Sequence, residues 1–592
     1  MQALKPLPSK AKQLLTQYPL LAPITGSLLL VAGGAGIFWL LTRSTFTPGT
    51  MPTGANIVPQ DALLVLTVST EPDQWRTLRR FGSPTSQQAF DQTLAGLREQ
   101  IFTSNGLDYE TDIQPWIGSE ITIAQLSPQS ELAPPEGSIP NAISPQPMVA
   151  VLPIRDPLKA KSTFDQPREL PGRKWSERKY KDIQIREAQV QDLSKPLTAL
   201  QVAVLNNNLL VIANSSRSIE QAIDTFRDSK KSLAATPGYS QALGQVQTER
   251  PFFSLYRNIP ASITSASVNL DQKLSAANQD WVKQSQGWTT VATLESNGIT
   301  LRNIAWLKPD SKRKFAVKNT AKILPDRLPA ETIAMFSGSD FQQFWADYRQ
   351  DYFTYPIQPI NPEIFSEGIE KSIGMSWEKD FLPWMKGEFA LGLVPSPDQQ
   401  SLSVLLMAQT SNRRAAEAVL KKLDGAMLER KKNKVEAEKL EGLAVTSWSD
   451  PATGAKTTHG WLNDNVVFLL LGPSIAKTFI PSPPSPLGQQ RPLQAGSTNR
   501  PETPVNGHFY TNFERTFSYP KLPAALQWLE PYRPWLDGIQ SVGLTAVNQT
   551  DRSSSFDIRA ILKRGQEPGP LPSFSPSPKP SPKPSPKPSA KP

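Results

Sequence analysis

The sequence predicts an α+β protein that consists of two tandem homologous domains, with antiparallel sheets and packed helices, preceded by one transmembrane helix. Three observations lead to this prediction: a segment that occurs twice, an uncharged apolar stretch near the amino terminus, and short apolar runs that alternate with amphipathic helical patterns. Hairpin-type strands mixed with helices are typical of α+β folds rather than of doubly wound parallel sheets.

The repeated segment spans residues 106–120 and returns at residues 374–388. Each copy carries a glycine, two acids, a Pro-Trp pair and a closing glutamate at the same spacing. We call the two copies the corner motifs, and their shared residues are Gly106, Glu110, Asp112, Pro115, Trp116 and Glu120, then Gly374, Glu378, Asp380, Pro383, Trp384 and Glu388. Trp75 and Trp345 repeat at nearly the same offset, and a constant offset is what a duplication leaves.

The repeat and the composition divide the chain into seven parts. They are a cytoplasmic basic segment (1–19), a transmembrane anchor (20–41), a linker (42–58), repeat domain 1 (59–308), a second linker (309–322), repeat domain 2 (323–565) and a disordered Pro/Ser/Lys tail (566–592).

The anchor prediction rests on residues 20–41, which carry no charge and can span the ~30 Å hydrocarbon core as a helix. Lys5, Lys10 and Lys12 precede the stretch, so the positive-inside rule places the amino terminus in the cytoplasm and the bulk in the periplasm or thylakoid lumen. A cleaved signal peptide and a buried core helix are the alternatives. We favour an uncleaved anchor because the stretch is long for a signal peptide and no small-x-small site follows.

Repeat domain 1 opens with an apolar run from Pro59 to Ser69, which predicts a strand. Thr70 with Asp73 has the spacing of a capping box, and Pro72 lies in the first turn, so a helix that contains Trp75 should follow. Further along, the three asparagines at 206–208 separate two apolar runs and predict a hairpin turn. A helix is expected over Ser216 to Arg227.

Repeat domain 2 follows the same order, with a strand after Pro329 and a helix that contains Trp345. Residues 411–429 predict an amphipathic helix, and residues 463–465 predict a second hairpin turn. Each domain should end in two strands, at 288–294 and 299–307 and at 542–547 and 556–562. Two proline-rich insertions are predicted to form loops, at residues 127–147 and 480–506.

The acids of the corner motifs have two interpretations. Two nearby carboxylates form an acid/base pair when burial separates their pKa values. Alternatively, the motif is a helix-to-strand connection, in which the tryptophan fills the core and the aspartate accepts hydrogen bonds from turn amides. The second interpretation is favoured, because a corner that defines the fold has to be kept in both copies.

Composition argues against several classes of function. The chain has no cysteine and only two histidines, His459 and His508, which have no metal-ligand spacing and read as strand residues near turns. No phosphate-binding glycine loop occurs, although a Ser-Lys arrangement stays open. Eight of the basic residues behind the net charge of +10 lie in the two ends, so the body is near neutral and nucleic-acid binding is not expected. No catalytic residue, metal or cofactor is predicted.

The repeated Lys-Pro-Ser-Pro of the tail cannot bury apolar surface and should form an extended chain. Its spaced lysines suit contact with anionic lipid or an anionic cell-wall polymer. The other expected partners are the membrane, through residues 20–41, and a protein of the envelope or of the thylakoid.

The corner motifs, the start of each domain and the single anchor together resemble the DUF3352 family, over roughly residues 55 to 565. Within that uncharacterised bacterial family, the chain looks like the cyanobacterial members. The resemblance implies a plasma or thylakoid membrane, but it brings no assigned reaction, cofactor or catalytic residue.

These observations favour a membrane-anchored, extracytoplasmic binding or accessory protein of the scaffold type, without enzymatic activity. Two alternatives stay open. One is a carboxylate-based envelope hydrolase, which would need several buried acids of one copy to share a pocket. The other is a carrier of an apolar ligand, held between the helices and the sheet.

Overall fold

The computed structural model describes residues 51–101, 108–127, 146–165, 173–190, 200–262, 283–315, 317, 320–321, 323–351, 361–396, 401–490, 492–493, 505–519, 522 and 524–572. The expected anchor at 20–41 and most of the tail lie outside these ranges. Within them, no helix combines the length and the apolar character needed to cross a membrane. We call residues 51–307 the first half and residues 323–572 the second half.

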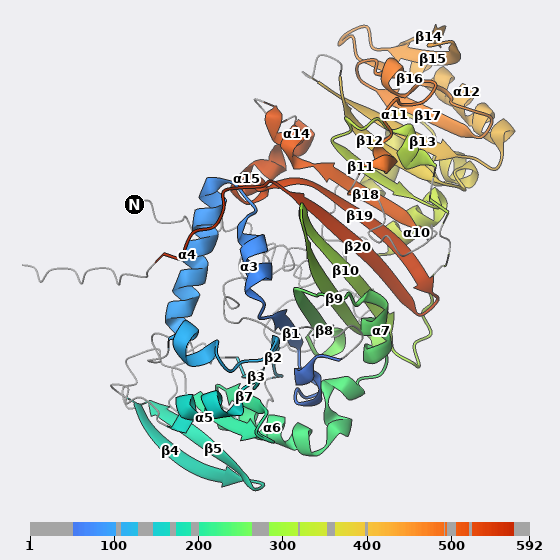
Figure 1. The fold of residues 1–592 in the computed structure, drawn as a ribbon. Helices are drawn as coiled ribbons and strands as arrows, with labels where there is room; N and C mark the ends of the chain where they lie inside the picture. The colour runs from blue at the N-terminus through green and yellow to red at the C-terminus, as the bar shows by residue number, and fades with distance from the viewer. Residues whose placement is uncertain are drawn as a thin grey trace, which may run out of the picture.

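The described strands form one antiparallel sheet (Figure 1). The first half contributes β1 (Leu64–Ser69), β2 (Glu120–Gln125), β3 (Met148–Pro153), β4 (Arg173–Tyr180), β5 (Ile183–Val190), β6 (Leu200–Leu205), β7 (Leu209–Ala213), β8 (Phe253–Asn258), β9 (Ser285–Glu295) and β10 (Gly298–Leu307). The second half contributes β11 (Ala334–Gly338), β12 (Phe389–Pro395), β13 (Leu402–Gln409), β14 (Lys434–Leu440), β15 (Leu443–Ser449), β16 (Lys456–Trp461), β17 (Val466–Leu471), β18 (Gly507–Asn512), β19 (Ile539–Thr550) and β20 (Ser553–Leu562).

The strands of the two halves pair in the same order. In the first half the order is β4-β5-β6-β7-β3-β2-β1-β8-β9-β10. In the second half it is β14-β15-β16-β17-β13-β12-β11-β18-β19-β20. The last strands, β10 and β20, then pair with each other, so the halves share one sheet instead of having the separate sheets that the sequence predicted. This pairing removes two open strand edges from solvent.

Helices cover both faces of the sheet, because alternate strand residues point to opposite sides. Face A, which includes Val68 and Leu301, packs against the first-half helices α3 (Pro72–Arg79), α4 (Pro84–Ile101) and α5 (Pro157–Asp165). In the second half it packs against α10 (Phe341–Asp351), α11 (Pro362–Ile373), α12 (Arg413–Glu429), α14 (Phe513–Ser518) and α15 (Arg533–Leu536). Face B, which includes Val65 and Phe468, packs against α6 (Ser216–Arg227), α7 (Tyr239–Val246) and α13 (Ala476–Phe479).

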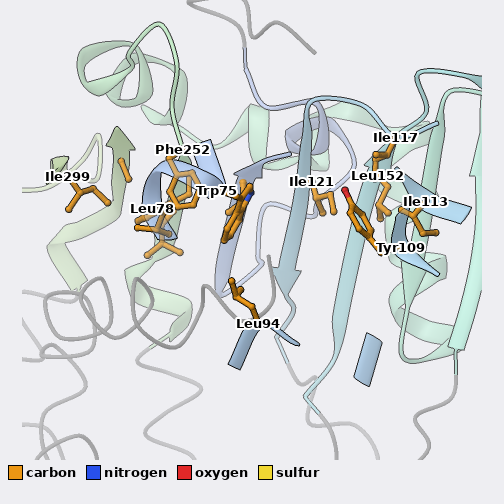
Figure 2. Close-up of a cluster of buried hydrophobic side chains, with 14 of the residues drawn as sticks. Trp75, Leu78, Leu94, Tyr109, Ile113, Ile117, Ile121, Leu152, Phe252 and Ile299 are labelled. Atoms are coloured by element: carbon orange, nitrogen blue, oxygen red, sulfur yellow. The ribbon is translucent and has the colours of Figure 1, made fainter. Parts of the chain in front are cut away.

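The core on face A of the first half does not stop at the end of that half. Figure 2 shows Trp75 and Leu78 of α3 and Leu94 of α4 beside strand residues such as Ile121 and Ile299. The same cluster continues through β10 into β20, where it includes Ile558 and Ala560. The two halves therefore share buried apolar surface as well as backbone hydrogen bonds.

Polar side chains reinforce the joint between the halves. The buried Asn303 of β10 donates through Nδ2 to the carbonyl of Phe556 in β20 at 3.1 Å and accepts from Thr290 Oγ1 at 2.6 Å. The backbone contacts are reciprocal as well. Leu307 N donates to Arg552 O, and Leu562 N donates to Asn297 O, both at 3.0 Å, so each terminal strand ends against the hairpin turn of the other half.

Two segments that the sequence assigned to a linker or to the tail are held by the fold. Arg552, in the turn between β19 and β20, donates from its guanidinium to the carbonyls of Ser311 at 2.7 Å, Pro309 at 3.1 Å and Arg313 at 3.2 Å, and also to that of Lys308. The beginning of the expected linker 309–322 is thus fixed to the sheet.

Residues 563–572 run back beside α4 of the first half (Figure 1). Gln566 N donates to Gln87 Oε1 at 3.0 Å, and Arg79 donates to Gly569 O at 2.7 Å. Residues 566–572 were expected in the disordered tail. Their backbone has partners on α3 and α4, so this part of the expected tail belongs to the fold.

Most local predictions agree with the structure. The helix at Ser216–Arg227 matches α6, and the hairpin asparagines Asn206 and Asn207 adopt the left-handed φ values of 48° and 58°. The capping box at Thr70 is wrong. Glu71 is the N-cap of α3 and its side chain makes no capping hydrogen bond, while the buried Thr70 hydroxyl donates to Gly118 O at 2.8 Å. Thr70 is therefore used to hold the corner motif against the end of β1.

The Arg552 contacts predict a measurable role at the joint. Arg552→Lys keeps the charge but places all donors on one nitrogen, so it can reach fewer of the four carbonyls that the two terminal guanidinium nitrogens contact. We expect the free energy of unfolding to fall by about 1–3 kcal/mol, measured by urea denaturation of the full chain. Arg564→Lys, at an exposed guanidinium, is the control and should change it by less than about 0.5 kcal/mol. An equal effect of both substitutions would contradict the assignment.

Candidate functional site

The first corner motif joins α4 to β2 through a π-helix at Tyr109–Ile113. Asp108 caps that helix by accepting from Thr111 N at 2.9 Å, and this bond lowers the pKa of Asp108. Asp112 Oδ2 accepts from Asp108 N at 2.7 Å. Both aspartates therefore organise the turn. Gly106, which opens the motif, lies outside the described residues.

The Pro-Trp pair of this motif leads into the strand. Pro115 lies in the turn after the π-helix, and the side chain of Trp116 is fully buried. The indole Nε1 of Trp116 donates to the backbone carbonyl of Asp112 at 2.5 Å. Glu110 points outward and forms a 3.1 Å ion pair with Arg98. Trp116 thus fills the core at the base of the turn.

The second corner motif repeats this arrangement around a π-helix at Trp377–Phe381. Asp380 Oδ2 accepts from Ser376 N at 2.8 Å, and Lys422 of α12 pairs with its other oxygen at 2.8 Å. The Lys422 contact lowers the pKa of Asp380. Glu378 accepts from Ser366 Oγ of α11 at 2.7 Å, so the two acids connect the motif to the helices that cover it.

The local backbone conformation explains why glycine is found at position 374 and proline at position 383 of this motif. Gly374 ends α11 with a left-handed φ of 70°, and the guanidinium of Arg430 occupies the space where a Cβ would lie. Pro383 lies in the short 3-10 helix Leu382–Trp384, where its missing N–H costs nothing. Trp384 is buried below it.

The closing glutamates differ from the other acids, because they are buried and bind backbone on face B. Glu120 and Glu388 are only 4% and 2% exposed. Glu120 Oε1 accepts from Thr53 N at 2.6 Å. Glu388 accepts from Ile323 N at 2.9 and 3.1 Å and from Leu324 N at 2.9 Å.

Each closing glutamate thereby holds the start of a 3-10 helix that leads into its half, Thr53–Asn56 or Leu324–Arg327. Residues 53–58 were expected in the linker 42–58 and instead belong to the core, where Ala55 and Val58 are buried. The two glutamates are not equally satisfied, since Glu120 Oε2 is buried with no hydrogen-bond partner. Burial raises the pKa of Glu120.

The acids of one corner motif have separate partners. Asp112 and Asp380 accept from turn amides that pack against face A. Glu120 and Glu388 accept, on face B, from backbone amides at the start of the 3-10 helix that leads into each half. Glu110 is on the surface. This arrangement uses the carboxylates as acceptors for backbone and for basic side chains, and gives them no common substrate position.

The structure also places a polar cluster that sequence reasoning missed. Asp424 Oδ1, on α12, accepts from Trp448 Nε1 at 2.7 Å and lies 2.8 Å from Nε2 of the buried His459. Since a carboxylate only accepts, His459 carries its proton on Nε2. The available signal was an acid on the apolar face of a predicted helix, beside Leu420 and Leu423.

His508, on β18, is far from this cluster in the sheet order and has a different environment. Its Nδ1 lies 3.2 Å from Thr545 Oγ1, and burial lowers its pKa to about 4, so it is neutral at physiological pH. Across the part of the chain that the structure describes, no three His, Cys, Asp or Glu residues are grouped to hold a metal ion.

Comparison with known proteins identifies a family for most of the chain. Residues 24–562 match the family described as "Protein of unknown function (DUF3352)". No curated protein matches the chain. No solved structure matches it either.

The closing glutamates predict opposite responses to the same substitution. Glu388→Gln should lower the free energy of unfolding at pH 7 by about 1–3 kcal/mol, because the charge-assisted hydrogen bonds from the backbone amides of Ile323 and Leu324 are weakened. Glu120→Gln should leave it unchanged or raise it by about 1 kcal/mol, because a buried carboxylate with one free oxygen becomes neutral. Urea denaturation of the full chain measures both.

The sign of the pH dependence follows from the raised pKa of Glu120. Folding favours the protonated form, so the wild type loses stability relative to Glu120→Gln as the pH rises from 4.5, the ordinary value, through the higher folded-state pKa. The difference should vanish below that window. A difference that grows as the pH falls would contradict this account.

Proposed function

This chain belongs to the DUF3352 family of proteins of unknown function, and on that premise we propose that it is a membrane-anchored extracytoplasmic binding protein of the scaffold type. In this proposal residues 20–41 hold the chain in the plasma or thylakoid membrane, with the amino terminus in the cytoplasm. The folded body lies in the periplasm or lumen and acts by binding other components, without a reaction of its own.

We also propose that the body consists of two homologous α+β domains that arose by duplication. The identical strand order of the halves supports this, since ten strands are most simply arranged alike twice when one module is copied. The corner motifs add support, because Asp112 and Asp380 each accept from the amide four residues before them. The domains are joined through β10 and β20 into one sheet.

The observation that carries the non-enzymatic role is the use of the repeated acids. Asp112, Asp380, Glu120 and Glu388 accept hydrogen bonds from backbone amides. A carboxylate-based hydrolase needs two acids within reach of one substrate bond. A rigid sheet with helices on both faces is instead suited to presenting a fixed surface.

The absence of cysteine makes the membrane orientation directly testable. Single cysteines are introduced by Asp464→Cys, at an exposed hairpin turn, and by Lys10→Cys, ahead of the anchor. The labelling uses intact cells whose outer membrane does not block the reagent. A membrane-impermeant maleimide should then label the Asp464→Cys protein and not the Lys10→Cys protein. After lysis it should label both. Labelling only of the Lys10→Cys protein would reverse the topology, and release of the protein without detergent would refute the anchor.

Affinity capture tests the scaffold role. Tagged full-length protein, purified from detergent-solubilised membranes, should bring down specific proteins that a tagged fragment of residues 1–50 does not. The fragment is the matched control because it keeps the anchor without the sheet. The same proteins in both captures, or hydrolysis of envelope polymers by the purified chain, would refute the scaffold role.

The tail contributes separately in this proposal. Its four lysines, Lys579, Lys583, Lys587 and Lys591, favour an anionic surface. Deleting residues 573–592 leaves the segment on α4 intact, so the deletion should keep the captured proteins and reduce sedimentation with anionic vesicles. Unchanged sedimentation would remove the tail from the proposal.

A further inference from the structure

The space between face A and the helices of the second half is filled by an aromatic cluster. It includes Phe341, Trp345, Trp377, Phe381, Trp384 and Phe389. The ring centroids of Trp345 and Trp377 are 5.5 Å apart, and Trp377 stacks on Phe381 at 5.3 Å. These rings come from α10, from the second corner motif and from β12, and α11 lies over them.

Three indole nitrogens in this cluster have no acceptor. Trp345, Trp377 and Trp384 are each more than nine-tenths buried, and the Nε1 atom of each lacks a hydrogen-bond partner. An indole Nε1–H is a donor only, so it cannot be satisfied by the surrounding rings in the usual way. Buried donors without partners are uncommon in native proteins and call for an explanation such as a bound group.

The corresponding tryptophans of the first half do have hydrogen-bond acceptors. Trp75, which repeats as Trp345, donates from Nε1 to Ser69 O at 3.1 Å. Trp116, which repeats as Trp384, donates to Asp112 O at 2.5 Å. The same positions of the same fold can therefore satisfy these donors with backbone carbonyls. In the second half, the Nε1 atoms of Trp345 and Trp384 both lack an acceptor.

Helix α11 lies over the aromatic cluster and is only partly buried. Ile364 of α11 is 70% exposed, and Phe365 and Ile369 are partly buried, whereas Pro362 and Ile373 near its two ends are buried. Helix α11 begins after the cap residue Asn361 and ends at Gly374, and its Ser366 donates to Glu378 of the second corner motif at 2.7 Å.

We propose that the aromatic cluster is a binding site for a neutral planar ring compound that carries carbonyl oxygens, admitted by displacement of α11. Aromatic walls favour stacking with a planar ring, and the open indole donors require acceptors. The cluster itself is made of apolar and aromatic side chains, which suit a neutral ligand better than a charged one, because a charged ligand would have to be desolvated there. The site goes beyond the scaffold role and does not depend on it.

Equilibrium dialysis of the full-length protein in detergent tests the site with two probes. One is 2-methyl-1,4-naphthoquinone, and the other is 2-methylnaphthalene, which has the same ring system without acceptors. We expect the quinone to bind about tenfold more tightly, which corresponds to one additional hydrogen bond. The lack of cysteine removes thiol addition as a source of apparent quinone binding.

Matched substitutions assign the effect to the indole donors. Trp345→Phe and Trp384→Phe each keep an aromatic ring but remove a donor, so the tenfold preference should shrink toward equal binding. Trp75→Phe, at the repeat position whose donor is satisfied, should leave the preference unchanged. A variant that has lost its fold would lose both probes, which separates misfolding from loss of a hydrogen bond.

The outcomes decide the proposal. Equal affinity of wild-type protein for the two probes would overturn it and would indicate that water occupies the indole donors. An equal response of Trp75→Phe and Trp345→Phe would overturn it as well. Failure of the affinity capture would leave this result unaffected, because dialysis measures the ligand without any partner protein.

Discussion

The backbone pairing of β10 with β20 is the constraint on which the rest of this structure depends. Each strand is the last of its half and would otherwise present an open edge. Their pairing makes one sheet, continues the face A core from Leu301 to Ile558, and brings each hairpin turn against the end of the opposite strand. The segments after both strands then have a fixed path, over Arg552 in one case and along α4 in the other.

That constraint explains which parts of the fold could be predicted from the sequence. Local patterns predicted α6, α12, the asparagine hairpins and the four terminal strands, because each depends on residues close together in the chain. The pairing of β10 with β20 joins strands separated by most of the second half, and no local pattern encodes it. The path of residues 566–572 was missed for the same reason, since its partners are on α3 and α4.

The corner motifs were visible as a repeat, but the roles of their acids were only partly predictable. Acceptance of turn amides by Asp112 and Asp380 follows from the local spacing of an aspartate in a turn. The role of Glu120 and Glu388 does not, because their partners Thr53 and Ile323 precede them by more than sixty residues. Asp424 shows the opposite case, since an acid on an apolar helix face was a local signal of a buried polar contact.

The same position in the two halves can differ greatly in how its polar groups are satisfied. Glu388 accepts from two backbone amides, whereas Glu120 accepts from one and keeps a free oxygen. The repeated tryptophans show the reverse, because Nε1 of Trp75 and Trp116 has a partner and Nε1 of Trp345 and Trp384 has none. Backbone topology therefore does not determine polar satisfaction by itself. Once one half and the joint maintain the fold, the other half can tolerate unsatisfied donors under a half-exposed helix, and sites for binding arise where such tolerance exists.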